Sequence, residues 1–185
     1  MNTRLFSFVG GRTGAWNIQR QATVVGDPLP KAECIDVLSG PVNTTGSSWT
    51  LRGITSNERY VERSEKEQLV TRQQGLGRPE ARCAAPIPIR KNAAWWSLTQ
   101  DERRSIFENQ SRHIQIGLTF LPAIARRRHH CRDVSEDEPF DFLTWFEYAP
   151  RYKNDFELLV AELRASEEWR YVDREIDIRL SRAGA

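Results

Sequence analysis

The chain has 185 residues, of which 39% are hydrophobic and 10% aromatic, a content typical of a compact folded domain and not of a disordered segment. Its formal net charge of +2 gives no support for nucleic-acid binding. The three cysteines are too few and too widely spaced for a disulfide framework or a cysteine-rich zinc site. Because no apolar run is typical of a signal peptide or a membrane span, we expect a cytoplasmic protein that contacts no membrane.

The first third of the chain is predicted to be rich in β-strands, because short alternating or β-branched runs are separated by turn residues. The predicted strands lie over residues 4–9, 15–25, 32–38 and 48–55. A glycine-rich segment separates the first two of these runs. We therefore expect these two strands to pair as an opening hairpin.

A helix and another strand are predicted next. Ser56 can cap a helix that ends near Gln74, just before two glycines. The strand over 84–91 contains Pro86 and Pro88, which lack backbone N–H donors. This pattern favours a sheet edge or a backbone carbonyl that is free to contact a ligand.

The second half of the chain gives the stronger signals. Thr99 and Glu102 form a capping box for a helix whose apolar face extends to Leu118, with His113 near its C-terminal end. A proline at position 122 ends this helix. Alternating and helical patterns then predict a strand over 124–131, a strand over 140–148, a helix over 156–163 and a strand over 172–180. The order βαββαβ is the ferredoxin-like arrangement, and a shorter, degenerate version is expected before it.

All three histidines lie in one region, as His113, His129 and His130. A helical histidine beside apolar residues usually serves packing, so His113 alone decides nothing. Strand alternation places Arg126 and Arg128 on one face, and a buried arginine there would need an anion because an unpaired buried charge is costly. A zinc site at His129, His130 and Cys131 is a poor alternative, since neighbouring strand residues point to opposite faces. A small α+β interaction domain is a further alternative.

Several segments of the chain carry a resemblance to a known family. They are Trp95–Trp96, His113, 121–126, 130–133 and 141–150, with 51–53 and 59–63 upstream and 167–169 and 174–180 downstream. In these segments the chain resembles the chlorite dismutase family, whose members use haem b to convert chlorite to chloride and dioxygen. Its length is similar to that of the family's short branch, in which the N-terminal half is truncated and the subunits pair as dimers.

The resemblance implies an α+β fold, a ferredoxin-like dimeric α+β barrel built from two ferredoxin-like halves in one compact domain. Residues 1–91 would form the truncated N-terminal half and residues 92–185 the haem-binding half. The implied assembly is a homodimer, and the implied cofactor is haem b.

The resemblance also implies roles for individual residues. His113 would be the proximal ligand of the haem iron, Glu168 would bind the other ring nitrogen of His113, and Lys91 would pair with Glu168. Arg126 would hold chlorite and other small anions at the distal haem face, with Gln73 holding the arginine in one orientation. Three further positions are implied to lie near the haem and its propionates: Tyr60, Trp95 and the backbone at Ile87.

Two positions depart from the short-branch pattern. Arg128 and His129 stand where an apolar or uncharged residue and an aromatic residue are more usual, and we expect Arg128 to extend past the pocket rim into solvent. The same fold leaves two alternative functions, a porphyrin-processing enzyme of the coproheme decarboxylase type and a low-activity haem peroxidase. Arg126 favours chlorite conversion over the decarboxylase, because those relatives generally lack an arginine there and are longer.

Overall fold

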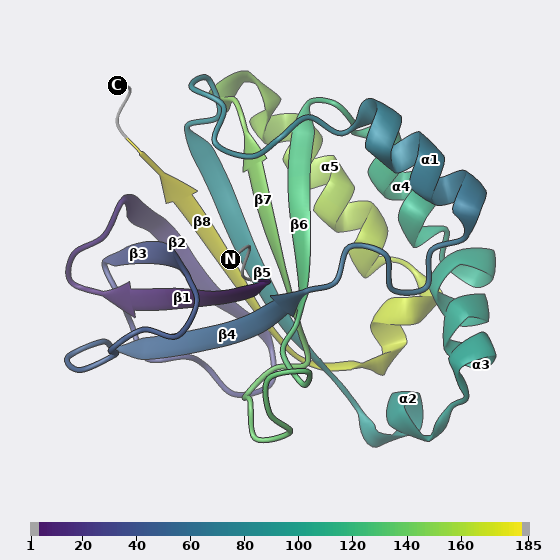
Figure 1. Cartoon of the computed structure of the whole chain (residues 1–185), viewed down its shortest axis with the longest axis horizontal. Helices are drawn as coiled ribbons and strands as arrows, with labels where there is room; N and C mark the ends of the chain where they lie inside the picture. Colours follow the sequence, from purple (N-terminus) through teal and green to yellow (C-terminus); the bar gives the residue numbers. More distant parts are fainter. Residues whose placement is uncertain (1–3, 183–185) are drawn as a thin grey trace.

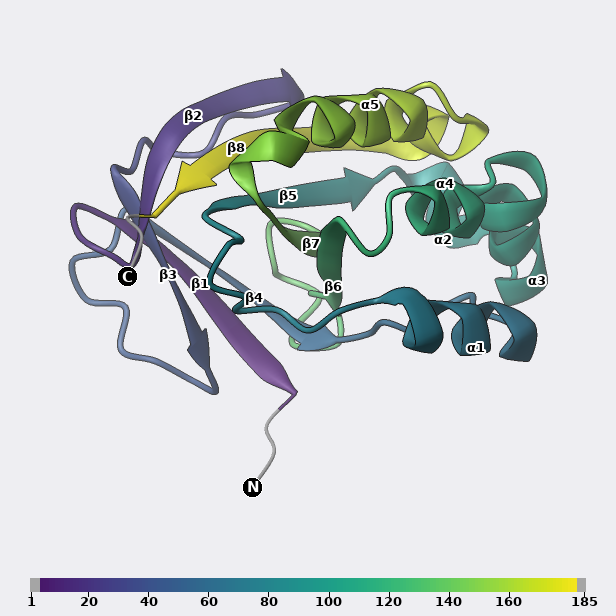
Figure 2. The same ribbon diagram turned by 90° about the horizontal axis from the view of Figure 1, so that it is seen from above.

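The structure, a computed structural model, describes residues 4–182. Eight strands form a closed barrel, and the helices pack against one side of it (Figure 1). Seen from above, the helices gather over the strands of the second half of the chain (Figure 2). None of the helices within the described residues is long and apolar enough to cross a membrane.

The first four strands of the described residues come before any helix, and helices and strands are mixed in the rest of the chain. The strands are β1 (Leu5–Gly11), β2 (Trp16–Val25), β3 (Cys34–Ser39), β4 (Trp49–Thr55), β5 (Cys83–Lys91), β6 (Ile124–His130), β7 (Phe142–Tyr148) and β8 (Val172–Ser181). The α-helices are α1 (Arg63–Arg72), α2 (Ala93–Ser97), α3 (Gln100–Arg104), α4 (His113–Thr119) and α5 (Lys153–Arg164). A π-helical turn, Ser105–Gln110, joins α3 to α4, and two 3₁₀ turns, Pro150–Tyr152 and Glu167–Tyr171, flank α5.

The barrel consists of two ferredoxin-like sheets. In the second sheet the strands lie in the order β8, β5, β7, β6, which is fourth, first, third, second along the chain. The first sheet has the same order, β4, β1, β3, β2, although no helix within the described residues separates its strands. The predicted α+β barrel with a reduced N-terminal half is therefore confirmed.

The predicted opening hairpin is wrong. β1 pairs with β3 and β4, whereas β2 pairs with β3 and β8, so β3 separates the first two strands. Gly10 and Gly11, which suggested a turn, belong to β1. A Cβ at Gly10 would overlap the ring of Trp49 on β4, so this glycine is needed for close packing.

Strand β5 belongs to the second sheet. It pairs with β7 and with β8, and it contacts no strand of the first sheet through a ladder of described residues. We predicted that the two halves meet between residues 91 and 92. By its pairing, β5 belongs with the strands of the second half, although it precedes residue 92. Pro86 and Pro88 lie opposite Trp145 and Leu143 of β7, and neither has a partner residue on β8. The missing N–H groups therefore cost the sheet little on the β8 side.

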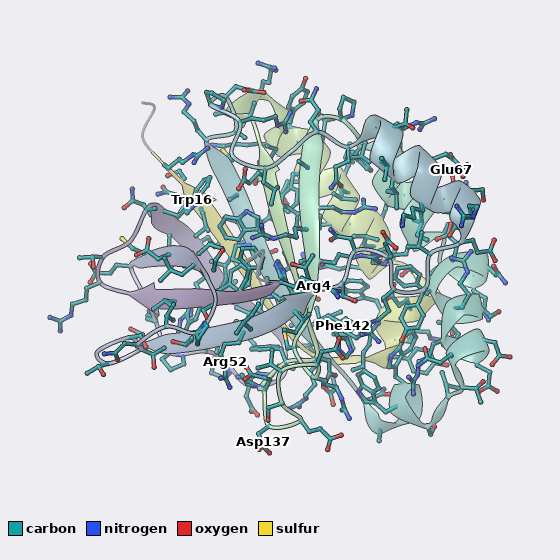
Figure 3. All side chains as sticks on the ribbon, viewed as in Figure 1. Arg4, Trp16, Arg52, Glu67, Asp137 and Phe142 are labelled. Carbon is teal, nitrogen blue, oxygen red and sulfur yellow. The ribbon has the colours of Figure 1, made fainter. Side chains whose placement is uncertain are left out.

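Apolar side chains form separate cores inside and outside the barrel. The interior is filled by large side chains, Phe8, Trp16, Trp49, Phe140 and Trp145 among them, and Trp16 can be followed in Figure 3. A second core packs α5 on the outer face of the second sheet, and a third joins α2, the π-helical turn and α4. The space between the second sheet and the helices therefore remains as the place for a ligand.

Candidate active site

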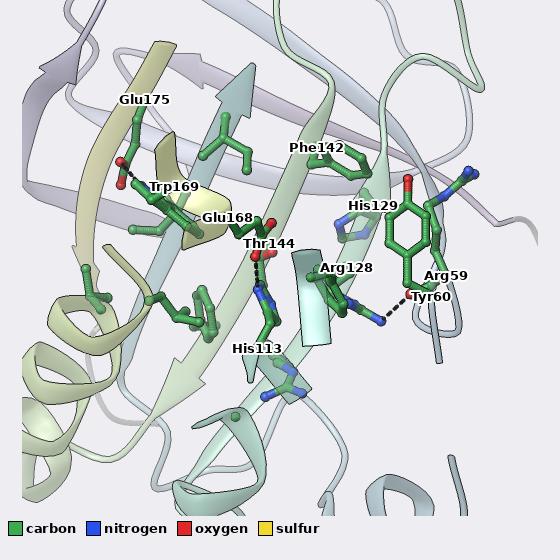
Figure 4. Close-up of a pocket in the computed structure, with 18 of the residues that line it drawn as sticks. Arg59, Tyr60, His113, Arg128, His129, Phe142, Thr144, Glu168, Trp169 and Glu175 are labelled. Carbon is green, nitrogen blue, oxygen red and sulfur yellow. Dashed lines mark hydrogen bonds and ion pairs between the residues drawn. The ribbon is translucent and has the colours of Figure 1, made fainter. Parts of the chain in front are cut away.

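A cavity lies between the outer face of the second sheet and helices α4 and α5 (Figure 4). It encloses about 890 Å³, counted to its open mouth. Its walls are mostly apolar, with Ile87, Ile89, Phe107, Phe142, Phe146, Leu159, Val160 and Leu163. Its polar groups include His113, Arg126, Arg128 and Glu168. The cavity therefore brings the predicted iron ligand and its glutamate together with the predicted anion-binding arginine.

His113 lies at the start of α4 and not near the end of a long helix, as we predicted. The helix after Thr99 passes into a π-helical turn, and Arg112, with φ of 55°, interrupts it in the left-handed region. A new helix then begins at His113. Glu108 stabilises it, because its carboxylate accepts hydrogen bonds from the backbone N–H groups of Ile114 (2.6 Å) and Gln115 (3.3 Å).

Three side chains form a buried chain behind the cavity. The Nδ1 atom of His113 lies 2.6 Å from Oε2 of Glu168, and Lys91 donates from Nζ to Oε1 of the same carboxylate at 2.8 Å. Glu168 is 3% exposed and Lys91 is also 3% exposed. Because Nδ1 is engaged, only Nε2 of His113 can bind a ligand, and Nε2 has no partner within the described residues.

Charge pairing controls the ionisation of these three side chains. Burial alone would raise the pKa of Glu168, but the charges and hydrogen bonds of Lys91 and His113 outweigh burial and lower it to about 2. Burial lowers the pKa of Lys91 and of His113, and Glu168 opposes both shifts. Glu168 is therefore a carboxylate that can accept the Nδ1 proton of a neutral imidazole.

Arg126 extends from β6 across the cavity to α4. Its guanidinium lies against Gly117, where a Cβ would overlap it, and no hydrogen bond or carboxylate engages the guanidinium among residues 4–182. Burial, followed by the charge of Arg128, lowers the pKa of Arg126 to about 9. Gln73 donates from Nε2 to the backbone carbonyl of Arg126 at 2.9 Å. The Gln73 side chain thus contacts the backbone of Arg126 and not the guanidinium of Arg126.

Arg128 lines the cavity, so the expectation that it extends past the rim into solvent is wrong. Its guanidinium donates to the backbone carbonyl oxygens of Asn57 and of Arg59 (3.4 Å), as Figure 4 shows for Arg59. It also lies over the ring of Phe107 at 5.4 Å. Strand alternation correctly placed it on the face of Arg126, but these carbonyls in the 56–61 loop direct the side chain inward.

Tyr60, Trp95 and Ile87 also line the cavity. Tyr60 lies in the loop before α1 with φ of 63°, so the predicted helix start at Ser56 is wrong; α1 begins at Arg63 after a capping box of Glu62 and Glu65. The Tyr60 hydroxyl and the Trp95 indole N–H are both buried and have no hydrogen-bond partner among the residues that the structure describes. Two unpaired donors in one cavity indicate a ligand with acceptor atoms.

The zinc alternative has no geometric support. His129 lies inside the barrel with its ring centroid 5.0 Å from that of Phe8, whereas His130 lies on the other face, 4.8 Å from the ring of Phe142. The two imidazoles therefore point away from each other, as strand alternation requires.

Some functional residues escaped prediction from sequence. Gly117 lies one helical turn after His113, and a glycine inside a predicted helix was the signal that could have found it. Glu108 gave no signal, because a capping carboxylate within an apparently continuous helix looks like an ordinary surface residue.

A closed barrel of two ferredoxin-like sheets, with a histidine–glutamate pair facing an arginine across an external cavity, defines a protein of the dimeric α+β-barrel class. The model of the chlorite dismutase family matches residues 39–183. The chain belongs to this family.

Solved and curated proteins agree with this assignment. A dimeric chlorite dismutase from Nitrobacter winogradskyi is 56% identical, with 96% of this chain and 99% of that chain covered and a TM-score of 0.89. A chlorite dismutase from Candidatus Nitrospira defluvii in complex with imidazole shares the fold, at 19% identity, 98% and 92% coverage and a TM-score of 0.68. Chlorite dismutase of Ideonella dechloratans is 31% identical over 100 residues, which span 53% of this chain and 33% of that protein.

Proposed function

We propose that this protein is a haem b enzyme that converts chlorite to chloride and dioxygen, and that it works as a homodimer. The observation that carries the proposal is the placement of His113, backed by Glu168, and Arg126 around one apolar cavity. The 56% identical relative, named a dimeric chlorite dismutase, supports both the activity and the dimer. No relative described above favours the decarboxylase or peroxidase alternative. Chlorite binding and a cytoplasmic location stay predictions.

The residues of the cavity fit a haem group. Nε2 of His113 is available as an iron ligand. Gly117, one turn later on α4, has no side chain, and the Arg126 guanidinium that fills this space would have to turn away for a flat ring to lie against the helix. The unpaired donors of Tyr60 and Trp95 suit the carboxylates of a porphyrin, and the apolar walls suit its faces. Ile87 belongs to these walls.

When bound, haem iron supplies the redox chemistry, in which both oxygen atoms of one chlorite leave as dioxygen and chloride is released. His113 serves as the ligand, and Glu168 holds its ring by accepting the Nδ1 proton, which makes the imidazole a stronger donor. Lys91 keeps Glu168 ionised and limits the negative charge that reaches the ring.

Arg126 binds and orients the anion. Its guanidinium has no partner among the described residues, stays protonated at neutral pH and can give two parallel hydrogen bonds to an oxyanion. The apolar walls lower the local dielectric and strengthen this attraction. Gln73 fixes the backbone from which the arginine extends.

An oxygen-electrode trace on haem-loaded protein with chlorite tests the proposal. We expect dioxygen in a one-to-one ratio to the chlorite consumed, with haem-free protein and free haem as controls. His113→Ala should lack tight haem binding, and added imidazole should restore a Soret band in that variant. A wild-type protein that gives no Soret band after haem addition, or no dioxygen once loaded, would contradict the proposal.

A further inference from the structure

A second cavity lies beside the active-site cavity and shares part of its wall. It lies between α1 and β6 and encloses about 670 Å³, counted to its open mouth. Two of its lining residues, Arg126 and Arg128, also line the larger cavity. The cleft under α1 therefore ends at the two arginines.

Neither arginine has a carboxylate partner within the described residues. Among residues 4–182 the Arg128 guanidinium donates only to the backbone carbonyls of Asn57 and Arg59, and burial, as the largest cause, lowers its pKa to about 10. The nearest acidic groups are already engaged, because Glu108 caps α4 and Glu168 binds Lys91 and His113.

Arg126 is buried and Arg128 half-buried, and two such like charges without a counter-ion destabilise each other. The charge of each arginine could be compensated by an anion that reaches them from solvent. A single small anion would also fit the fork of donors that each guanidinium presents.

The mouth of the cleft carries a third cation. Lys66 on α1 pairs with Glu58 at 2.7 Å, and the two side chains are 48% and 65% exposed. This exposed pair is weak and easily opened, so Lys66 can exchange Glu58 for another anion. Cations therefore lie at both ends of the cleft, with Lys66 outside and Arg128 inside.

We propose that Arg128 forms a second binding site for a small monovalent oxyanion, at the junction of the cleft and the active-site cavity, from which the anion passes to Arg126. The proposal rests on the proposed function, in which Arg126 holds chlorite. Arg128 is a positioning residue in this scheme, because it acts on the anion before the anion reaches the reacting atoms.

Stopped-flow binding of azide to the holoenzyme tests the proposal. We expect the association rate constant of Arg128→Gln to fall about fivefold or more at low ionic strength, because a cation that steers the anion is lost. The dependence of this rate on salt should weaken in the variant. Lys66→Gln should show a smaller fall.

Arg127→Gln is the matched control. Arg127 carries the same charge on the same strand, but its guanidinium lies over Phe6, 3.6 Å from the ring centroid and outside both cavities. Its azide rate should equal that of the wild type. Equal falls in the two variants would show a general charge effect and would overturn the proposal.

A porphyrin carboxylate is the other anion that could bind Arg128. If it does, Arg128→Gln will weaken haem binding, leave binding of haem dimethyl ester unchanged and leave the azide rate unchanged. That result would overturn the small-anion site.

Thermal unfolding of haem-free protein distinguishes failure of this proposal from failure of the proposed function. At constant ionic strength, nitrate should raise the thermal midpoint of the wild type and of Arg127→Gln equally, and that of Arg128→Gln less, because only the site at Arg126 remains in that variant. This result would hold even if chlorite were not converted, whereas equal nitrate effects in all three proteins would overturn the anion site alone.

Discussion

Glu168 is the residue on which the buried charges of the site depend. It accepts from Lys91 on one carboxylate oxygen and faces His113 on the other; Glu168 and Lys91 are buried and the His113 side chain is 15% exposed. A buried ion pair adds little net stability when intact, yet removing one partner leaves a buried charge. The stability of this side-chain cluster is therefore sensitive to loss of Lys91.

Lys91→Met should lower the free energy of unfolding of haem-free protein by about 3–5 kcal/mol at pH 7, because Glu168 loses its main counter-charge. Lys66→Met is the matched control, since the Lys66–Glu58 pair is exposed and should contribute at most about 1 kcal/mol. Urea unfolding followed by circular dichroism measures both. Similar losses of unfolding free energy in the two variants would show that burial gives the Lys91–Glu168 pair no larger effect than the exposed pair.

Arg126→Ala should keep haem but slow oxygen evolution, because the guanidinium that holds the anion is removed. Hypochlorite should also escape more readily, so the Soret band should bleach after fewer turnovers. Arg127→Ala serves as the control. The retaining role would be refuted by a variant with wild-type turnover number and bleaching.

At the scale of elements, α4 decides how the site is built. The sequence could predict that His113 lies on a helix and Arg126 on the following strand, because both patterns are local. It could not show that the helix breaks at Arg112, since neither the π-helical turn nor the cap from Glu108 has a distinct residue pattern. That break places His113 in the first turn of a new helix.

Gly117→Leu should separate stability from ligand binding. Leucine favours a helix by about 1 kcal/mol over glycine, and the three atoms nearest to its Cβ would belong to the flexible end of Arg126. The haem-free protein should therefore unfold at an equal or higher urea concentration, whereas haem affinity should fall because the side chain fills the cavity. Unchanged haem affinity, measured by titration at the Soret band, would argue against a ring bound over Gly117.

The histidines of β6 should make stability depend on pH. Burial, then the charges of Arg127 and Arg59 respectively, lowers the pKa of His129 to about 3 and of His130 to about 4. The unfolded chain, with histidine pKa values of about 6.5, binds more protons between these limits. Stability should thus be retained above pH 6.5 and fall as the pH drops toward 4, by about 1.4 kcal/mol per pH unit for each histidine.

Urea unfolding at several pH values measures this slope. His130→Phe should reduce it, because one of the histidines with a lowered pKa is removed. A wild-type protein whose stability is constant between pH 6.5 and 5 would contradict the prediction.

At the scale of the molecule, the site belongs to the second sheet and its helices. The first sheet keeps the ferredoxin-like strand order without the helices that would cover it, and its contribution to the cavity comes from the 56–61 loop that follows β4. The strand order could not be read from local patterns, because the pairing of β1 with β3 and β4 depends on residues far apart in the chain. The resemblance to a known family correctly implied it.

The protein should be a dimer in solution, as the 56% identical relative is named. Light scattering coupled to size-exclusion chromatography should give twice the chain mass of 21.4 kDa at micromolar concentration. The mass should be equal for haem-free and haem-loaded protein, because the cavity is formed within one chain. A monomer at these concentrations would refute the assignment.

The placement of the tryptophans gives the chain an optical property of its own. Trp95 and Trp169 line the cavity, while Trp16, Trp49 and Trp145 fill the barrel behind the sheet that forms its wall. A haem in the cavity would absorb the ultraviolet emission of these indoles by energy transfer. The intrinsic fluorescence of the chain should therefore darken as the cofactor binds and return as it leaves, so occupancy can be followed without a label.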